Sequence, residues 1–206
     1  KLHVVADSDC SGSGKLEVSA GVVLSSSGWP VSLTSAEIEL SGSVSSGSAL
    51  TTFSVCSGES MDLGGVTGVL AGSSAWSLDA SELGRVSSTG LVLSASTGSI
   101  TVYEVDSVAT AGVTGLVTLD ASVSGDVSFV ETSEWRSVVA LGGAGGSGIL
   151  VNANVTSTEG DLTLDGNSGG VEVAAGAAVK SSGALYLQTE SSVGSVRVVS
   201  PVVLSG

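Results

Sequence analysis

The sequence predicts an all-β protein folded as a parallel β-helix, a β-solenoid in which short strands stack turn upon turn. The clearest pattern lies in residues 160–199, where pairs of Val or Leu flank one polar residue at 162–164, 171–173, 185–187 and 196–198. Each triplet is typical of a minimal strand with two side chains on one face and one on the other. The links that contain Gly and Ser are too short for helices, so the strands must turn corners repeatedly.

The composition favours a thin core. The apolar content is 42% and the mean hydropathy is +0.49, which exclude a disordered acidic chain. Aromatic residues make up only 3%, and there are 30 glycines. The core must therefore consist of small and β-branched side chains in thin layers, which suits a narrow coil better than a thick sandwich.

The strand pattern changes in regularity along the chain. Residues 1–88 keep the alternation at 16–18, 31–33, 38–40 and 53–55, but they also hold both cysteines, Met61 and two of the three tryptophans. We interpret this part of the chain as turns with longer corner loops. From residue 88 onward strand starts recur at intervals of 22 to 25 positions, as from Leu162 to Leu185. That spacing predicts about nine turns and a rod roughly 45 Å long. We expect one solenoid over 1–206, less regular in 1–88 and regular in 89–206.

A pair of immunoglobulin-like sandwiches is the alternative fold. No segment shows a helical stripe and no linker divides the chain. Trp29, Trp76 and Trp135 lie 47 and 59 positions apart. Neither spacing fits one core tryptophan in each sandwich of about 100 residues.

The charge excludes several classes of partner. The net charge is -14, from 20 acidic and 6 basic residues, and it repels nucleic acids and anionic membranes. The longest charge-free stretch, 137–158, is rich in Gly, Ala, Asn and Ser, which argues against a membrane span. The chain begins at Lys1 without a leader pattern, so we expect a mature or excised segment of a longer chain.

Cys10 and Cys56 are compatible with one disulfide or with two free buried thiols. They lie 46 positions apart, which is the length of two turns at the predicted spacing. Two turns separate strands by roughly 10 Å, beyond the reach of a relaxed disulfide. A bridge would require Cys10 to lie in a folded-back end segment.

The repeat style resembles a known family. Residues 149–199 and 91–102, and most closely Gly160-Asp161-Leu162-Thr163-Leu164-Asp165-Gly166 and Gly183-Ala184-Leu185-Tyr186-Leu187, resemble the repeats of filamentous-haemagglutinin-like adhesins. The resemblance covers about the last 115 residues. It implies a right-handed parallel β-helix and a secreted or cell-surface rod that adheres or assembles. The Asn-Pro-Asn elements typical of that family's secretion domain are missing, which leaves the export route open.

Three short motifs resemble functional loops, but each lacks the neighbouring residues or elements that the function requires. Residues 166–170 (Gly-Asn-Ser-Gly-Gly) look like a protease nucleophile loop, but the only histidine, His3, lies at the start of the chain. Residues 143–148 satisfy a dinucleotide fingerprint but precede a strand-like run. Residues 11–15 resemble a phosphate loop, but Leu16 stands where Ser or Thr is required. No catalytic residue and no cofactor is predicted.

Surface carboxylates and one sequon remain. Asp161 with Asp165, Glu104 with Asp106 and Glu131 with Glu134 could serve a carbohydrate-active β-helix, although outward polar residues are also needed for solubility. Calcium could bind such acids, but no calcium motif is present. Asn154-Val155-Thr156 is a sequon, which makes Asn154 a candidate glycosylation site.

We therefore expect an extracellular or cell-surface structural or adhesive rod that is not an enzyme. Self-association into an end-to-end filament, continuation of a longer chain, and cell-surface glycans are the expected partners. The alternative is a carbohydrate-active β-helix that binds or cleaves polysaccharide with its surface carboxylates. A sandwich-type binding module is a third hypothesis.

Overall fold

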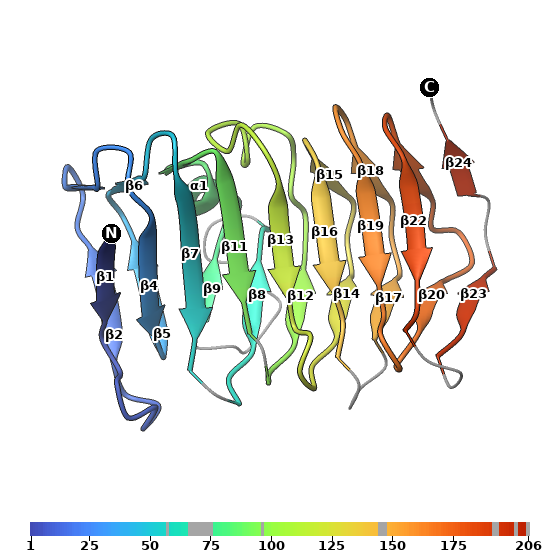
Figure 1. Ribbon diagram of the computed structural model, residues 1–206, viewed down its shortest axis with the longest axis horizontal. Helices are drawn as coiled ribbons and strands as arrows, with labels where there is room; N and C mark the ends of the chain where they lie inside the picture. The colour runs from blue at the N-terminus through green and yellow to red at the C-terminus, as the bar shows by residue number, and fades with distance from the viewer. Residues whose placement is uncertain are drawn as a thin grey trace.

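The computed structural model confirms a β-solenoid of parallel stacked coils with about 7 turns (Figure 1). It describes residues 1–56, 58–65, 76–95, 97–143, 148–190 and 194–199, and the backbone of 202–204. Every strand pair in this part of the chain is parallel. Among these residues no helix is long and apolar enough to cross a membrane.

The longest sheet has eight strands and forms the front face in Figure 1. Its strands, in spatial order, are β1 (Leu2–Val5), β4 (Val31–Ser35), β7 (Leu50–Val55), β11 (Gly90–Ser94), β13 (Val117–Asp120), β16 (Val138–Leu141), β19 (Leu162–Asp165) and β22 (Leu185–Gln188).

The other faces of the coil are divided among four sheets. The seven-stranded one contains β23 (Val196–Val198), β20 (Val171–Val173), β17 (Ile149–Val151), β14 (Val127–Phe129), β12 (Ile100–Val102), β8 (Met61–Leu63) and β9 (Trp76–Leu78). The remaining strands form three short sheets: β15 (Ser133–Trp135), β18 (Val155–Ser157), β21 (Val179–Ser181) and β24 (Val202–Leu204); β10 (Val86–Ser87), β6 (Ser43–Ser45) and β3 (Val23–Ser25); and β2 (Lys15–Val18) with β5 (Glu37–Leu40).

Alternation along each strand creates the core. In β19, Leu162 and Leu164 are fully buried while Thr163 between them faces outward, as the triplet pattern predicts. The parallel register has no slip, so inward aliphatic side chains stack on their counterparts in the next turn, as Leu164 does on Leu187. The core is thus a single thin column of aliphatic layers, widened near the first third by Phe53 and Trp76 in edge-to-face contact.

The number of turns is smaller than the nine predicted, because the early turns are unequal in length. Leu2 pairs with Val31, 29 positions away, and Thr51 pairs with Leu91, 40 positions away. The later turns that follow Leu91 advance by 26, 21, 24 and 23 positions. The predicted interval of 22 to 25 positions therefore describes the later turns to within one position and fails where a corner carries an insertion.

The turn from Thr51 to Leu91 contains the largest insertion. It contributes both β8 and β9 to one sheet, and β9 also lies against β5. A one-turn helix, α1 (Ala80–Leu83), follows β9 and is an exception to the expectation of no helix. Its cause is a capping box in which Asp79 accepts from the Glu82 amide at 2.8 Å and Glu82 accepts from the Asp79 amide at 3.0 Å.

Some corners pack too closely for any side chain. A Cβ added to Gly125 would lie 1.7 Å from the carbonyl oxygen of Gly98 one turn earlier, and one added to Gly98 would lie 1.8 Å from that of Glu59. Glycine at these corners lets consecutive turns approach at strand spacing.

Candidate functional site

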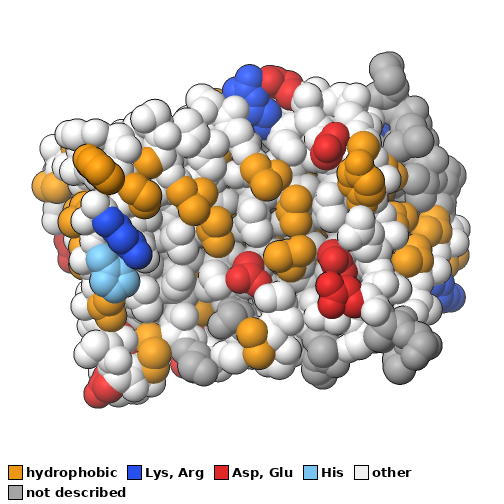
Figure 2. Space-filling model, viewed as in Figure 1, with side chains coloured by type: hydrophobic (Ala, Val, Ile, Leu, Met, Phe, Trp, Pro, Cys, Tyr) orange, Lys and Arg blue, Asp and Glu red, His pale blue; other side chains and the backbone are white. Residues whose placement is uncertain are grey.

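The broad front face carries little charge. Its central outward residues are hydroxyl or aliphatic, namely Ser32, Thr52, Val92, Thr118, Val139 and Thr163. Figure 2 shows this face with mostly uncharged and hydrophobic side chains, a few acidic and basic ones, and the histidine. Most of the net charge of -14 is therefore carried by other surfaces.

The protease-like loop 166–170 is a corner between β19 and β20. Asn167 has a φ of 49° and Gly170 a φ of 96°, and the Asp165 carboxylate accepts from the Asn167 amide at 3.0 Å. His3 lies in β1, at the opposite end of the solenoid (Figure 1), where it is exposed. The loop therefore has the geometry of a turn, and the only imidazole lies far from it.

The other two motifs also lack the context they need. Lys15 begins β2 and donates to Glu39 at 2.6 Å, with Glu37 at 3.7 Å. The hydrogen bond to Glu39 raises the pKa of this ammonium group, and the carboxylates of Glu37 and Glu39 beside it would repel a phosphate. The dinucleotide-like stretch 143–148 falls partly outside the described residues, and β17 follows it directly.

Three of the candidate carboxylates accept hydrogen bonds from backbone amides. Asp161 accepts from the Ala184 amide at 2.8 Å, and Asp165 accepts from the Asn167 amide. Four residues of strand separate their Cα atoms by roughly 13 Å, more than the roughly 5–9.5 Å between glycosidase carboxyl groups. Asp106 likewise accepts from the Ala109 amide at 2.8 Å. Within the described residues no group of three metal-ligating side chains is found.

Asn154 is exposed and directly precedes β18. Its carboxamide oxygen accepts from the Ala178 amide at 2.9 Å, which links two turns. Glycosylation modifies the nitrogen of the carboxamide and leaves this oxygen in place. The sequon remains a candidate glycosylation site.

Cys10 and Cys56 are joined by a disulfide, with Cα atoms 5.2 Å apart. The connection is possible because residues 6–14 form a loop that leaves the stack between β1 and β2 and folds back toward β7. The bridge thereby fastens the corner of the outermost turn to the corner of a turn further inside.

Asp7 organises the same loop. Its buried carboxylate accepts from the amides of Ser11 at 3.1 Å and Gly12 at 3.0 Å, and from the Ser11 hydroxyl at 3.3 Å. Desolvation raises the pKa of this carboxyl, but hydrogen bonds with Asp9, Gly12 and Ser11 lower it by more, so the pKa lies below its ordinary value.

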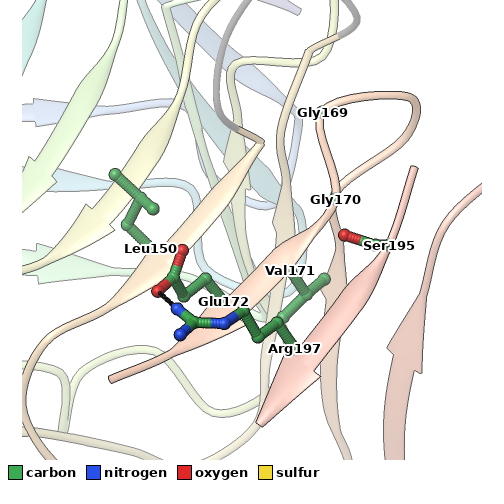
Figure 3. A pocket seen from close by; sticks show the side chains of 7 residues that line it. All are labelled: Leu150, Gly169, Gly170, Val171, Glu172, Ser195 and Arg197. Atoms are coloured by element: carbon green, nitrogen blue, oxygen red, sulfur yellow. Dashed lines mark hydrogen bonds and ion pairs between the residues drawn. The ribbon is translucent and has the colours of Figure 1, made fainter. Parts of the chain in front are cut away.

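Two ion pairs of an arginine with a glutamate lie in surface depressions of the described part of the chain. The first depression, of about 270 Å³, lies over β17, β20 and β23, where Arg197 pairs with Glu172 beside Leu150 (Figure 3). At the second, Arg136 pairs with Glu159 at 2.5 Å. Hollows of about 160 Å³ and 320 Å³ adjoin this second pair and share both residues. We call these two hollows with their ion pair the Arg136 groove. The groove cannot be found from the sequence, because its residues come from three turns and form no linear motif.

Comparison of the chain with protein-family models, curated proteins and solved structures finds no significant match. The resemblance to adhesin repeats therefore rests on repeat style and on the β-solenoid fold.

Proposed function

We propose that this chain is part of an extracellular structural or adhesive rod, continued at its outer coil by further turns or by another copy. The proposal rests on the exposure of core residues in that outer coil, which is the last coil of the solenoid and contains β22, β23 and β24. Val196 and Val198 of β23 are 44% and 41% exposed, whereas their counterparts Val171 and Val173 are 1% and 0% exposed. These residues belong to the core column and need another layer to bury them.

The backbone of the outer coil supports the same proposal. Within the described residues, β22 pairs with β19 and β23 pairs with β20, each on one side only. An unpaired edge of this kind is a template for another parallel strand.

The two ends of the solenoid are different surfaces. At the first end, β1, β2 and β3 also pair on one side only within the described residues, but Leu16 and Val18 of the outermost turn are buried, and the disulfide fastens the neighbouring loop. A contact between unlike ends is heterologous, and repeated heterologous contacts generate open filaments. The disulfide also fits an oxidising extracellular compartment.

Enzymatic action on polysaccharide is the less supported alternative. Asp161 and Asp165 are far apart along the strand and each accepts a backbone hydrogen bond, so neither is arranged as half of an acid and nucleophile pair. Incubation with a panel of glycans, with and without a chelator, tests this alternative. Product formation would favour it over the rod.

Electron microscopy and sedimentation velocity test the rod proposal. The purified chain should form unbranched fibres whose axial repeat is a multiple of the strand spacing. Val196→Lys places a charge in the exposed core layer and should leave single short rods. Val108→Lys is the matched control, because Val108 is 73% exposed on a side loop, and its fibres should persist.

If the unmodified chain forms only short rods at all concentrations, assembly from several copies is refuted. Continuation of the rod by further turns of a longer chain then remains as the proposal. A globular particle, or equal loss of fibres in both variants, would contradict the proposal.

A further inference from the structure

The Arg136 groove owes its existence to unequal neighbouring turns. The turn from Leu91 to Val117 advances by 26 positions, and the next, from Val117 to Val138, advances by 21. The additional residues lie in the corner 103–116, which is held by single bridges from Val105 to Ser133 and from Val113 to Ser88. The longer corner stands beside the shorter one, and the groove lies at the step between them.

The base of the groove is held by several hydrogen bonds. The Arg136 carbonyl oxygen accepts from the amides of Glu159 at 3.1 Å and Gly160 at 2.9 Å. The Ser157 hydroxyl lies 3.0 Å from the same oxygen and 2.7 Å from that of Gly160. The backbone that carries both charged residues is thereby fixed before any ligand arrives, which lowers the entropic cost of binding.

The lining is polar and offers both donors and acceptors. Arg136 and Glu159 keep 41% and 57% of their side chains exposed, so the guanidinium retains free donors and the carboxylate free acceptors. Thr110 and Thr158 line the smaller hollow, and Thr114 and Ser137 the larger one. The hydroxyls of Thr158 and Ser137 already donate to the carbonyl oxygens of Trp135 and Asp161, so they offer a ligand acceptors, and the guanidinium supplies the donors. Adjacent hydroxyl groups of a sugar ring can accept from the guanidinium and donate to the carboxylate at the same time. The hollows on either side give neighbouring sugar units a place to lie.

The charge decides which sugars fit. Glu159 lies in the groove itself, and the whole chain carries -14, so an acidic sugar would be repelled. The exposed aliphatic side chains of the lining are Ala111 and Leu116, the latter at 42%, which is too little for a peptide that must bury large apolar anchors. A neutral polyhydroxylated chain matches both the polarity and the charge.

We infer that the Arg136 groove binds a neutral oligosaccharide, with Arg136 and Glu159 holding adjacent hydroxyl groups and one sugar unit in each hollow. The inference rests on the proposed role as an adhesive rod and assigns its ligand class and its site.

Nuclear magnetic resonance titration of the ¹⁵N-labelled chain tests this assignment. The probes are neutral hexasaccharides of glucose, mannose and xylose, with an oligogalacturonate as the acidic comparison. At least one neutral probe should shift the amide signals of Gly115, Ser137 and Gly160. Arg136→Gln and Glu159→Gln should each weaken that binding at least about tenfold, the loss expected for one charge-assisted hydrogen bond.

Arg197→Gln is the matched control, because it breaks the other arginine and glutamate pair and should leave the affinity unchanged. Thermal unfolding of each variant verifies that the fold is intact. The assignment is overturned if no neutral probe binds or if only the acidic probe binds. It is also overturned if peptides from a library bind the groove and the neutral sugars do not. Equal weakening of sugar binding by Arg197→Gln and Arg136→Gln would overturn it as well. Fibres that form without sugar binding would leave the rod proposal standing and refute only the groove.

Discussion

The carboxamide oxygen of Asn154 accepts a hydrogen bond from the backbone amide of Ala178, one turn further along the solenoid, at 2.9 Å. Asp126 and Asp161 make the same kind of link, to the amides of Gly148 at 3.0 Å and Ala184 at 2.8 Å. Corner side chains therefore join consecutive turns where the strand ladders stop. These links satisfy amides that would otherwise lack a partner.

Asn154→Ala should lower the free energy of unfolding by about 1 kcal/mol, because the Ala178 amide loses its acceptor. Asn154→Asp retains an oxygen at this position and should cost less. Urea unfolding of both variants measures the difference, with exposed Asn152→Ala as the control. Equal stability of Asn154→Ala and the unmodified chain would show that water replaces the bond.

A contrast between two buried serines gives a second prediction. The Ser157 hydroxyl lies within bonding distance of two carbonyl oxygens, whereas the buried Ser133 hydroxyl has no hydrogen-bond partner among the residues that the structure describes. Ser157→Ala should therefore destabilise the protein by about 1 kcal/mol, and Ser133→Ala should be neutral or stabilising. Thermal unfolding of the two variants side by side measures this, and a greater loss for Ser133→Ala would contradict the assignment of their partners.

Removal of the disulfide should act mainly on the first turns. Cys10→Ala combined with Cys56→Ala opens a loop of 46 residues and should cost about 2–4 kcal/mol. Because each turn of a solenoid contacts only its neighbours, amide hydrogen exchange should accelerate in β1 and β2 and remain slow in β19 and β20. Uniform acceleration along the whole rod would show instead that the solenoid unfolds as one unit.

Acid should weaken the Asp7 loop within a defined pH window. The pKa of Asp7 is lowered from 3.8, so its ionised form stabilises the folded state above that value, and the contribution is lost as the pH falls through the lowered pKa. Asp7→Asn should be less stable than the unmodified chain at pH 7, and the gap should close below pH 3.8. Urea unfolding across this range measures the gap, with Glu104→Gln as a control for the loss of one negative charge. A gap independent of pH would attribute the effect to packing alone.

The regular turns could be predicted closely from the sequence. Leu162 and Leu164 were expected to share one face, and both are buried, because alternation in a strand is a local property of the backbone. The number of turns was overestimated, because the insertion that carries β9 and α1 lengthens one turn without interrupting the alternation on either side. The length of each corner depends on the position at which the chain rejoins the stack of strands, and the alternation within the strands does not reveal that position.

The sequence by itself determined the local strand pattern, the thin aliphatic core and the acidic surface, because each follows from the types of residues and their spacing. Only the tertiary structure decided that Cys10 meets Cys56 and that Arg136 meets Glu159. The first pair lies 46 positions apart and the second is separated by one turn. Contacts between turns depend on the summed lengths of all corners between the two residues, so no short segment of sequence contains them.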